Sequence, residues 1–330
     1  MKIHRRLPMK WRVAAVFVAV GAIWGSAWIP TAALPQAEPR LLVGALRFAL
    51  AAALLAVAAA SDRLRQRPDQ RQTMARLLVP SALLGVTMVG LPYALTVWAS
   101  GRVSPGVTAL CFGFMPLLVL LFEGGEQEWA IPAVALGIAG VAMVVAPGVS
   151  FRWQQAAGVA ALLTATGLST FSYLYVRRLF AEGRLGSENI LSFCAIQTGV
   201  ASVLLAMVLV SLKQEFTFRL DETAALPLVV LAIVVSSATL PLFFWLLHQM
   251  AAWQAATLQW VSTLVAATEA AWVVHARPAA ANWAGAVLVP ACIFWIFLHA
   301  KGASAGAVTP EITEHTFALA KASDFKRKSE

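Results

Sequence analysis

The sequence predicts an all-α polytopic membrane protein, with ten transmembrane helices arranged as two inverted five-helix repeats. Composition, the spacing of apolar runs and an internal repeat lead to this fold. Of the 330 residues, 60% are hydrophobic and 12% are charged, and the mean hydropathy is +0.75. A soluble domain has about 45–50% apolar and about 25% charged residues. The composition therefore excludes an ordinary soluble domain.

Ten apolar runs, separated by charged or turn residues, predict the ten helices. A run near 20 residues crosses a bilayer core of roughly 30 Å as a helix. These runs are too uniformly apolar for the alternating strands of a membrane barrel. They cover residues 12–34, 41–60, 77–99, 105–122, 129–146, 155–176, 189–212, 224–247, 253–274 and 280–299, between an N-terminal segment (1–11) and a polar tail (300–330).

The positive charges predict that both termini are cytoplasmic, in a bacterial inner membrane. With the N-terminus inside, cytoplasmic segments hold 18 of the 25 Lys and Arg residues and the opposite segments hold 6. Such an excess marks the cytoplasmic side. The net charge of +9 is therefore interpreted as membrane orientation, and no nucleic-acid partner is expected. Cysteines lie within apolar runs, which favours free thiols over disulfides or a metal site; they are Cys111, Cys194 and Cys292.

Two shifts align the halves of the chain, residues 12–146 and 155–299. A shift of 146 pairs residues 13–28 with 159–174, and a shift of 149 pairs Leu91–Pro92 with Leu240–Pro241. With five spans each, the halves must enter the membrane in opposite directions. Inverted repeats are typical of secondary transporters, whose substrate site lies at the repeat interface near the midplane.

Four segments, taken in order, resemble an EamA-type member of the drug/metabolite transporter superfamily. The resemblance covers roughly residues 12–300 and implies ten helices, two inverted repeats, and export or uptake of small metabolites. The segments are "AIWGSAWI" (22–29), "PRLLVGALRFALAAALL" (39–55), "YALTVWASGRVSPGVTALCFGFMPLLVLLFEGGE" (93–126) and "GVAALLTATGLSTFSYLYVRRL" (158–179). The sequence departs from the family at Thr263, where Pro is usual, at "HAR" (275–277), where Gly-Glu is usual, and at Glu269 in a stretch that is usually apolar.

Glu269 and Arg47 are charged residues deep inside predicted spans. A charge at the bilayer centre costs about 2.5–3.5 kcal/mol on insertion scales and marks a functional site by default. A helical rise of about 1.5 Å per residue places Arg47 about 10 Å and Glu269 about 9 Å below the outer edge. We therefore hypothesise that they face one cavity and pair, and that Glu269 carries a coupling proton. Separate solvation, or bonding of Arg47 to carbonyls of a broken helix, are the alternatives.

Aromatic and polar side chains within the spans are candidates for lining a substrate cavity. Each aromatic residue has helix packing or lipid contact as its alternative role. The aromatic candidates are Trp24, Trp28, Tyr93, Phe112, Phe114, Tyr173, Tyr175, Phe244 and Trp260. Gln259 and Thr263 share one face of a helix at i, i+4. Glu123 is interpreted as an interfacial charge, and Gly21 with Gly25 as a packing motif.

These features predict a secondary active transporter that moves small metabolites or amino acids outward by alternating access. Neither a cofactor nor a metal is expected. A small-molecule substrate, membrane lipid and a proton or other coupling ion are the expected partners. The P-loop motif is absent, which disfavours direct use of ATP. A passive channel or facilitator is the alternative. An intramembrane lipid-processing enzyme is a further alternative, but the spans contain no nucleophile–base pair or paired carboxylates, so an enzyme is not expected.

Overall fold

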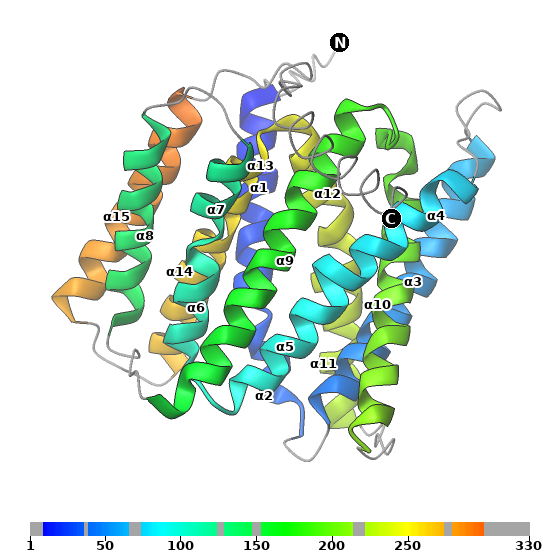
Figure 1. The fold of residues 1–330 in the computed structure, drawn as a ribbon, viewed down its shortest axis with the longest axis horizontal. Coiled ribbons are helices and arrows are strands. Elements are labelled where there is room, and N and C mark those ends of the chain that lie inside the picture. Colours follow the sequence, from blue (N-terminus) through cyan, green and yellow to red (C-terminus); the bar gives the residue numbers. More distant parts are fainter. Residues whose placement is uncertain are drawn as a thin grey trace, which may run out of the picture.

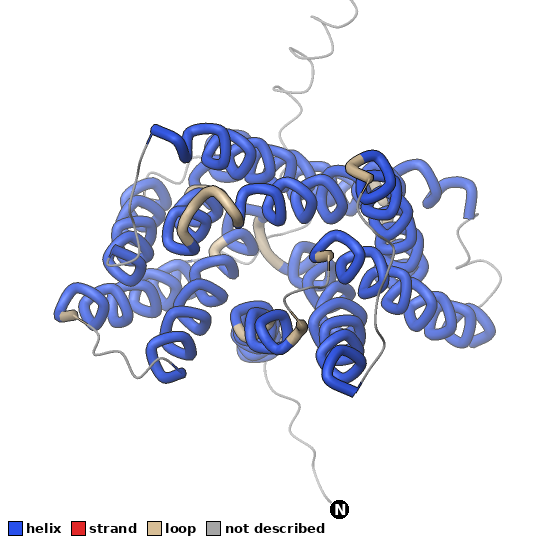
Figure 2. Tube along the Cα trace, turned by 90° about the horizontal axis from the view of Figure 1, so that it is seen from below, coloured by secondary structure: helices blue, strands red, loops and turns tan. Residues whose placement is uncertain are grey.

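A computed structural model describes residues 9–35, 39–65, 74–123, 129–146, 153–213, 222–273 and 279–299. The first eight residues, the tail 300–330 and the "HAR" departure at 275–277 lie outside these ranges. Throughout them the regular secondary structure is helical, without a strand. Figures 1 and 2 show a bundle of helices that run mostly along one common direction.

The described helices follow the predicted runs closely, but several spans are divided into shorter pieces. The first half contains α1 (Met9–Gly25), α2 (Trp28–Ala33), α3 (Arg40–Arg65), α4 (Met74–Leu84), the π-helix η2 (Gly85–Gly90), α5 (Leu91–Ser100), α6 (Pro105–Gly113), α7 (Met115–Glu123) and α8 (Ala130–Val145). The second half contains η4 (Trp153–Gln155), α9 (Ala156–Ala181), η5 (Ser187–Asn189), α10 (Ile190–Ser211), α11 (Glu222–Val230), the π-helix η6 (Leu231–Ala238), α12 (Thr239–Gln249), α13 (Ala252–Ala256), α14 (Leu258–Val273) and α15 (Ala280–His299).

Eight helical segments in the described ranges are long and apolar enough to cross a membrane, and Ala130–Val145 is a shorter apolar helix. Large apolar side chains also face outward from the bundle, among them Val57, Leu226 and Val287. An outer surface of this kind is suited to contact with lipid tails. The prediction of an all-α, multi-pass membrane protein is confirmed at this level.

Two π-helical segments interrupt the spans predicted over residues 77–99 and 224–247. Segment η2 ends directly before Leu91–Pro92, and η6 ends at Ala238, with Thr239 between it and Leu240–Pro241. A proline has no N–H for the i→i−4 bond, and its ring crowds the preceding turn. The backbone N–H of Leu91 accordingly bonds to the carbonyl of Val86, five residues earlier. The wider turn of η2 therefore lies directly before the Leu91–Pro92 pair.

Close approach between helices depends on small residues. Helix α1 packs on α14, and an added Cβ at Gly25 would lie 2.6 Å from the carbonyl oxygen of Ser262. An added Cβ at Gly21 would lie 2.7 Å from the Val261 side chain. The interpretation of Gly21 and Gly25 as a packing motif is therefore confirmed.

Candidate functional site

A cavity of about 320 Å³ lies between helices of the two sequence halves. This volume is at the lower end of the range for small-molecule sites, roughly 300–1,000 Å³. Segments α1, α3, η2, α5, α6 and α7 contribute to its wall from the first half, and α9, η6, α12 and α14 from the second. Its lining residues are Trp24, Arg47, Phe48, Met88, Val89, Pro92, Tyr93, Thr96, Phe112, Met115, Ser169, Tyr173, Val235, Ser236, Leu240 and Gln259.

Arg47 supplies the charge in this lining. The side chain extends from α3, and its Nε donates a hydrogen bond of 2.8 Å to the hydroxyl oxygen of Ser236 on η6. Its guanidinium carbon lies 5.2 Å from the centroid of the Phe48 ring. The cation is therefore oriented by one hydroxyl and one aromatic face, without a carboxylate in the cavity wall.

Several predicted cavity residues do line this cavity. They are Trp24, Arg47, Tyr93, Phe112, Tyr173 and Gln259. The surrounding structure fixes two of the aromatic rings: the indole N–H of Trp24 donates to the Thr239 hydroxyl at 2.8 Å, and Tyr173 packs on Phe243 with ring centroids 4.9 Å apart. These contacts hold flat apolar surfaces in fixed positions around the space that Arg47 faces.

The structure does not bring five other predicted residues to the cavity wall. They are Trp28, Phe244, Trp260, Thr263 and Glu269. Trp260 is fully buried in the core, where its indole N–H donates to the Gly113 carbonyl at 3.0 Å. Phe244 is also fully buried and packs on Phe193. The hydroxyl of Thr263 donates to the Gln259 carbonyl one turn earlier. Ser and Thr side chains within helices commonly make this bond to their own helix backbone.

Glu269 lies at the contact between α14 and the end of α1. Its two carboxylate oxygens accept hydrogen bonds from the Ser26 hydroxyl, at 2.6 Å, and from the Trp28 indole N–H, at 3.1 Å. Ser26 is in the break between α1 and α2, and Trp28 begins α2. The carboxylate therefore holds the broken first span against α14.

The predicted Glu269–Arg47 ion pair is wrong, because the two side chains have different partners and no salt bridge joins them in the described structure. The depth estimate placed both residues by their distance along the helix axis and carried no information on direction around it. Helix α14 packs on α1, whereas α3 packs on α10 and η6. Glu269 and Arg47 therefore have different neighbouring helices, although their predicted depths are similar.

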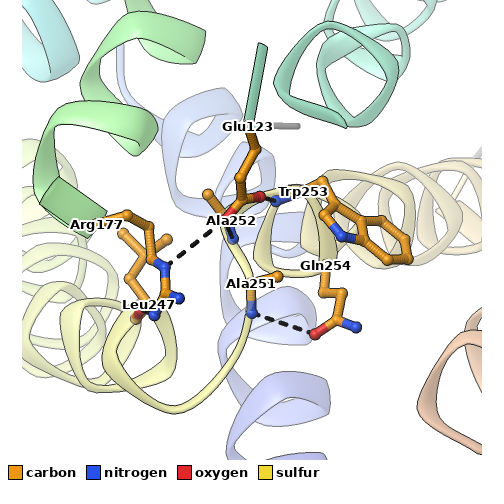
Figure 3. A network of polar contacts seen from close by, with 7 residues as sticks. All are labelled: Glu123, Arg177, Leu247, Ala251, Ala252, Trp253 and Gln254. Carbon is orange, nitrogen blue, oxygen red and sulfur yellow. Dashed lines mark hydrogen bonds and ion pairs between the residues drawn. The ribbon is translucent and has the colours of Figure 1, made fainter. Parts of the chain in front are cut away.

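Glu123 has a structural role that the sequence did not reveal (Figure 3). Its carboxylate accepts hydrogen bonds from the backbone N–H groups of Ala252, at 2.9 Å, and Trp253, at 2.8 Å, which begin α13. The Nε of Arg177 lies 3.7 Å from the same carboxylate, and Arg177 also donates to the Leu247 carbonyl. Glu123 therefore ties α7 to α9 and to the start of α13, a role that the prediction of an interfacial charge did not include.

Other lining residues were missed because their residue types give little signal in an apolar span. Ser169 and Ser236 are small hydroxyl residues, and Met88 and Val89 look like ordinary packing residues. One signal was available for η2 and η6. The repeated Leu-Pro pair marks both spans, and a helix interrupted by proline widens or bends near that position.

Comparisons with known proteins bear on the fold. No family model matches the chain. No curated protein matches it. A solved structure described only as "Crystal structure of protein" is similar to it, with a TM-score of 0.70 and 17% sequence identity over 88% of this chain and 98% of that chain. This similarity shows a shared fold, and function must be argued from the site itself.

Proposed function

We propose that this protein is a secondary active transporter that moves a small organic solute across a membrane by alternating access, as an EamA-type member of the drug/metabolite transporter superfamily. The observation that carries the proposal is the cavity between the two sequence halves, which contains Arg47 and is bordered by two π-helical segments. Interrupted helices around a central polar site are typical of transporter binding sites. Export is the direction we propose.

Helix neighbours support ten spans in two inverted repeats. Assigned in chain order, α3 and α10 are the second and seventh spans and pack together, as do α8 and α15, the fifth and tenth. The ninth span, α14, packs on the first, α1, and the fourth, α6 with α7, packs on the sixth, α9. Exchanging the two halves leaves the pairs α3–α10 and α8–α15 unchanged, and it converts the pair of the first and ninth spans into the pair of the sixth and fourth. The two π-helical segments also correspond, since each precedes a Leu-Pro pair.

Two carboxylates provide contacts that could open in turn. Glu123 and Glu269 are 146 residues apart, the shift that aligns the first spans of the two halves. Glu123 bonds to the start of α13, and Glu269 bonds to the start of α2. Figure 1 shows α13 and α2 toward opposite ends of the bundle. We propose that these contacts help close opposite ends of the transport path and that they do not both persist through the cycle.

Proton coupling at Glu269 is part of the same proposal. Ionised carboxylate oxygens accept two hydrogen bonds well, whereas a protonated carboxyl group has less acceptor capacity. Protonation would therefore weaken the contacts with Ser26 and Trp28 and free the first span from α14. Membrane-embedded carboxylates serve as proton relays in other transporters. The membrane we propose is a bacterial inner membrane, with both termini cytoplasmic.

Glu269→Gln tests the coupling role. The amide keeps one acceptor oxygen but does not take up a proton, so we expect solute exchange to continue while acceleration by an imposed proton gradient is lost. The measurement is uptake into proteoliposomes with and without that gradient, using Glu182→Gln, an acid at an exposed position after α9, as the control. A Glu269→Gln protein that responds to the gradient like the wild type would contradict coupling at Glu269.

Counterflow tests the transport proposal as a whole. Proteoliposomes loaded with an unlabelled solute should transiently accumulate the same labelled solute if an alternating-access carrier is present. A panel of small organic acids, amines and neutral compounds, with and without a proton gradient, identifies the cargo. Flux that neither saturates nor shows counterflow would overturn the carrier and favour the channel alternative.

A further inference from the structure

We propose that the cavity binds a small organic monoanion, with the carboxylate or sulfonate of the ligand on Arg47 and a flat apolar body against the aromatic wall. This inference rests on the proposed transport function and specifies the class of substrate that is transported. It does not depend on Glu269, which bonds elsewhere.

The charge balance of the cavity leads to this ligand. Among the lining residues, Arg47 is the ionised group, and no Asp or Glu accompanies it. Its Nε is bonded to Ser236, and its two terminal nitrogens have no hydrogen-bond partner among the described residues. An unpaired guanidinium inside a membrane-spanning bundle is costly. A bound anion would compensate it, and the guanidinium fork matches the paired oxygens of a carboxylate or sulfonate.

The orientation of the Arg47 guanidinium supports a role in binding a ligand anion. The hydrogen bond to Ser236 comes from η6, in the opposite half of the sequence, and the Phe48 ring lies against the cation on the α3 side. These two contacts leave the terminal nitrogens for a ligand. Because η6 belongs to the second half and α3 to the first, a ligand on Arg47 lies where the two halves meet.

The uncharged residues of the cavity wall indicate the shape and polarity of the rest of the ligand. Tyr173, Gln259 and Ser169 line the cavity, and their polar side chains make no hydrogen bond within the described ranges. Trp24, Tyr93 and Phe112 add aromatic surface. Flat surfaces with a few polar groups favour a ligand with an aromatic or similarly flat apolar body that carries a hydrogen-bonding substituent. A volume of about 320 Å³ favours a small ligand, at the lower end of the range for small-molecule sites.

Binding to purified wild-type protein in nanodiscs tests the charge requirement. Toluenesulfonate and phenylacetate probe the two anionic head groups, toluenesulfonamide is a neutral compound close to the sulfonate in shape, benzylamine is a cation, and sulfate is an anion without an apolar body. Equilibrium dialysis of each labelled probe gives its affinity. We expect at least one of the two organic anions to bind at least about tenfold more tightly than the other three probes. Equal binding of toluenesulfonate and toluenesulfonamide, with no stronger binding of phenylacetate, would overturn the proposal.

Variants locate the binding at Arg47. Loss of a charged hydrogen-bonding partner corresponds to about a 10- to 100-fold loss of affinity, which we expect for the anion in Arg47→Gln, with a smaller loss in Arg47→Lys. Gln259→Glu adds a negative charge to the same cavity with little change in shape, so it should also weaken anion binding. This variant provides a second test in case Arg47→Gln does not fold. Arg102→Gln is the matched control, because Arg102 is exposed and stacks on Trp98 outside this cavity. Unchanged anion affinity in both Arg47→Gln and Gln259→Glu would overturn the proposal.

Counterflow with the same probes separates this inference from the proposed function. Arg47-dependent anion binding without counterflow of that anion would support the binding site and contradict transport of this ligand class. Counterflow of neutral or cationic solutes that persists in Arg47→Gln would support a transporter and overturn the anion site.

Discussion

Replacing Glu123 by alanine is expected to lower the free energy of unfolding by about 2–4 kcal/mol. The carboxylate accepts hydrogen bonds from the Ala252 and Trp253 N–H groups and lies beside Arg177. Its removal leaves two helix-terminal donors and a largely enclosed guanidinium without their shared acceptor. Unfolding by SDS in mixed micelles, followed by circular dichroism, measures the change.

Two matched variants separate the parts of this effect. Glu123→Gln keeps one acceptor oxygen and loses the charge, so it should fall between the wild type and Glu123→Ala. Glu182→Ala removes an acid that is also paired with arginines, Arg178 and Arg184, but whose side chain is 33% exposed. The hydrogen bond from Arg178 holds the pKa of Glu182 below its usual range. Exposed pairs contribute below about 1 kcal/mol, so a Glu182→Ala loss as large as that of Glu123→Ala would contradict this account.

Gly137→Ala is expected to lower the free energy of unfolding by about 2–4 kcal/mol, since one added methyl group collides with a fixed ring. The new Cβ would lie 2.2 Å from Cζ3 of Trp260. Trp260 is fully buried, and its indole N–H bonds to the Gly113 carbonyl. The ring therefore has little freedom to move without losing that bond. The same SDS titration measures the loss.

The chain offers both a control and a rescue for this prediction. Gly167 is an exposed residue of α9, and an added Cβ there would meet nothing within 4 Å. Gly167→Ala should stabilise the protein by up to about 1 kcal/mol through helix propensity. Trp260→Phe removes the part of the ring that collides, so Gly137→Ala should cost less in that background. An equal cost in both backgrounds would show that the clash with Trp260 is not the cause.

Composition and apolar run length were sufficient to predict the fold class, because a membrane leaves helices as the form in which such runs satisfy their backbone. The breaks within spans were harder to predict. Phe114 separates α6 from α7, and Thr257 separates α13 from α14, yet both lie in apolar sequence. Hydropathy records how a residue partitions into lipid and is insensitive to whether the backbone is bonded to the residue four positions back.

The candidate site was predicted in part for a similar reason. Aromatic residues and Arg47 are conspicuous in a span, and several of them line the cavity. Trp260 and Phe244 are equally conspicuous but fill the core instead. Distinguishing these outcomes requires the direction of each side chain around its helix and the identity of the neighbouring helix. The Glu269–Arg47 prediction failed on that point, since both residues were placed by depth alone.

The two π-helical segments set the rotational phase of the helices that follow them. An α-helix advances about 100° per residue, and a π-turn holds about one residue more than an α-turn. Side chains after η2 and η6 are therefore rotated, relative to an uninterrupted α-helix, by an angle of that order. Tyr93 follows η2 and Leu240 follows η6, and both line the cavity. Insertion or deletion of one residue in either segment would turn a different set of side chains toward the cavity while leaving the hydropathy of the span almost unchanged.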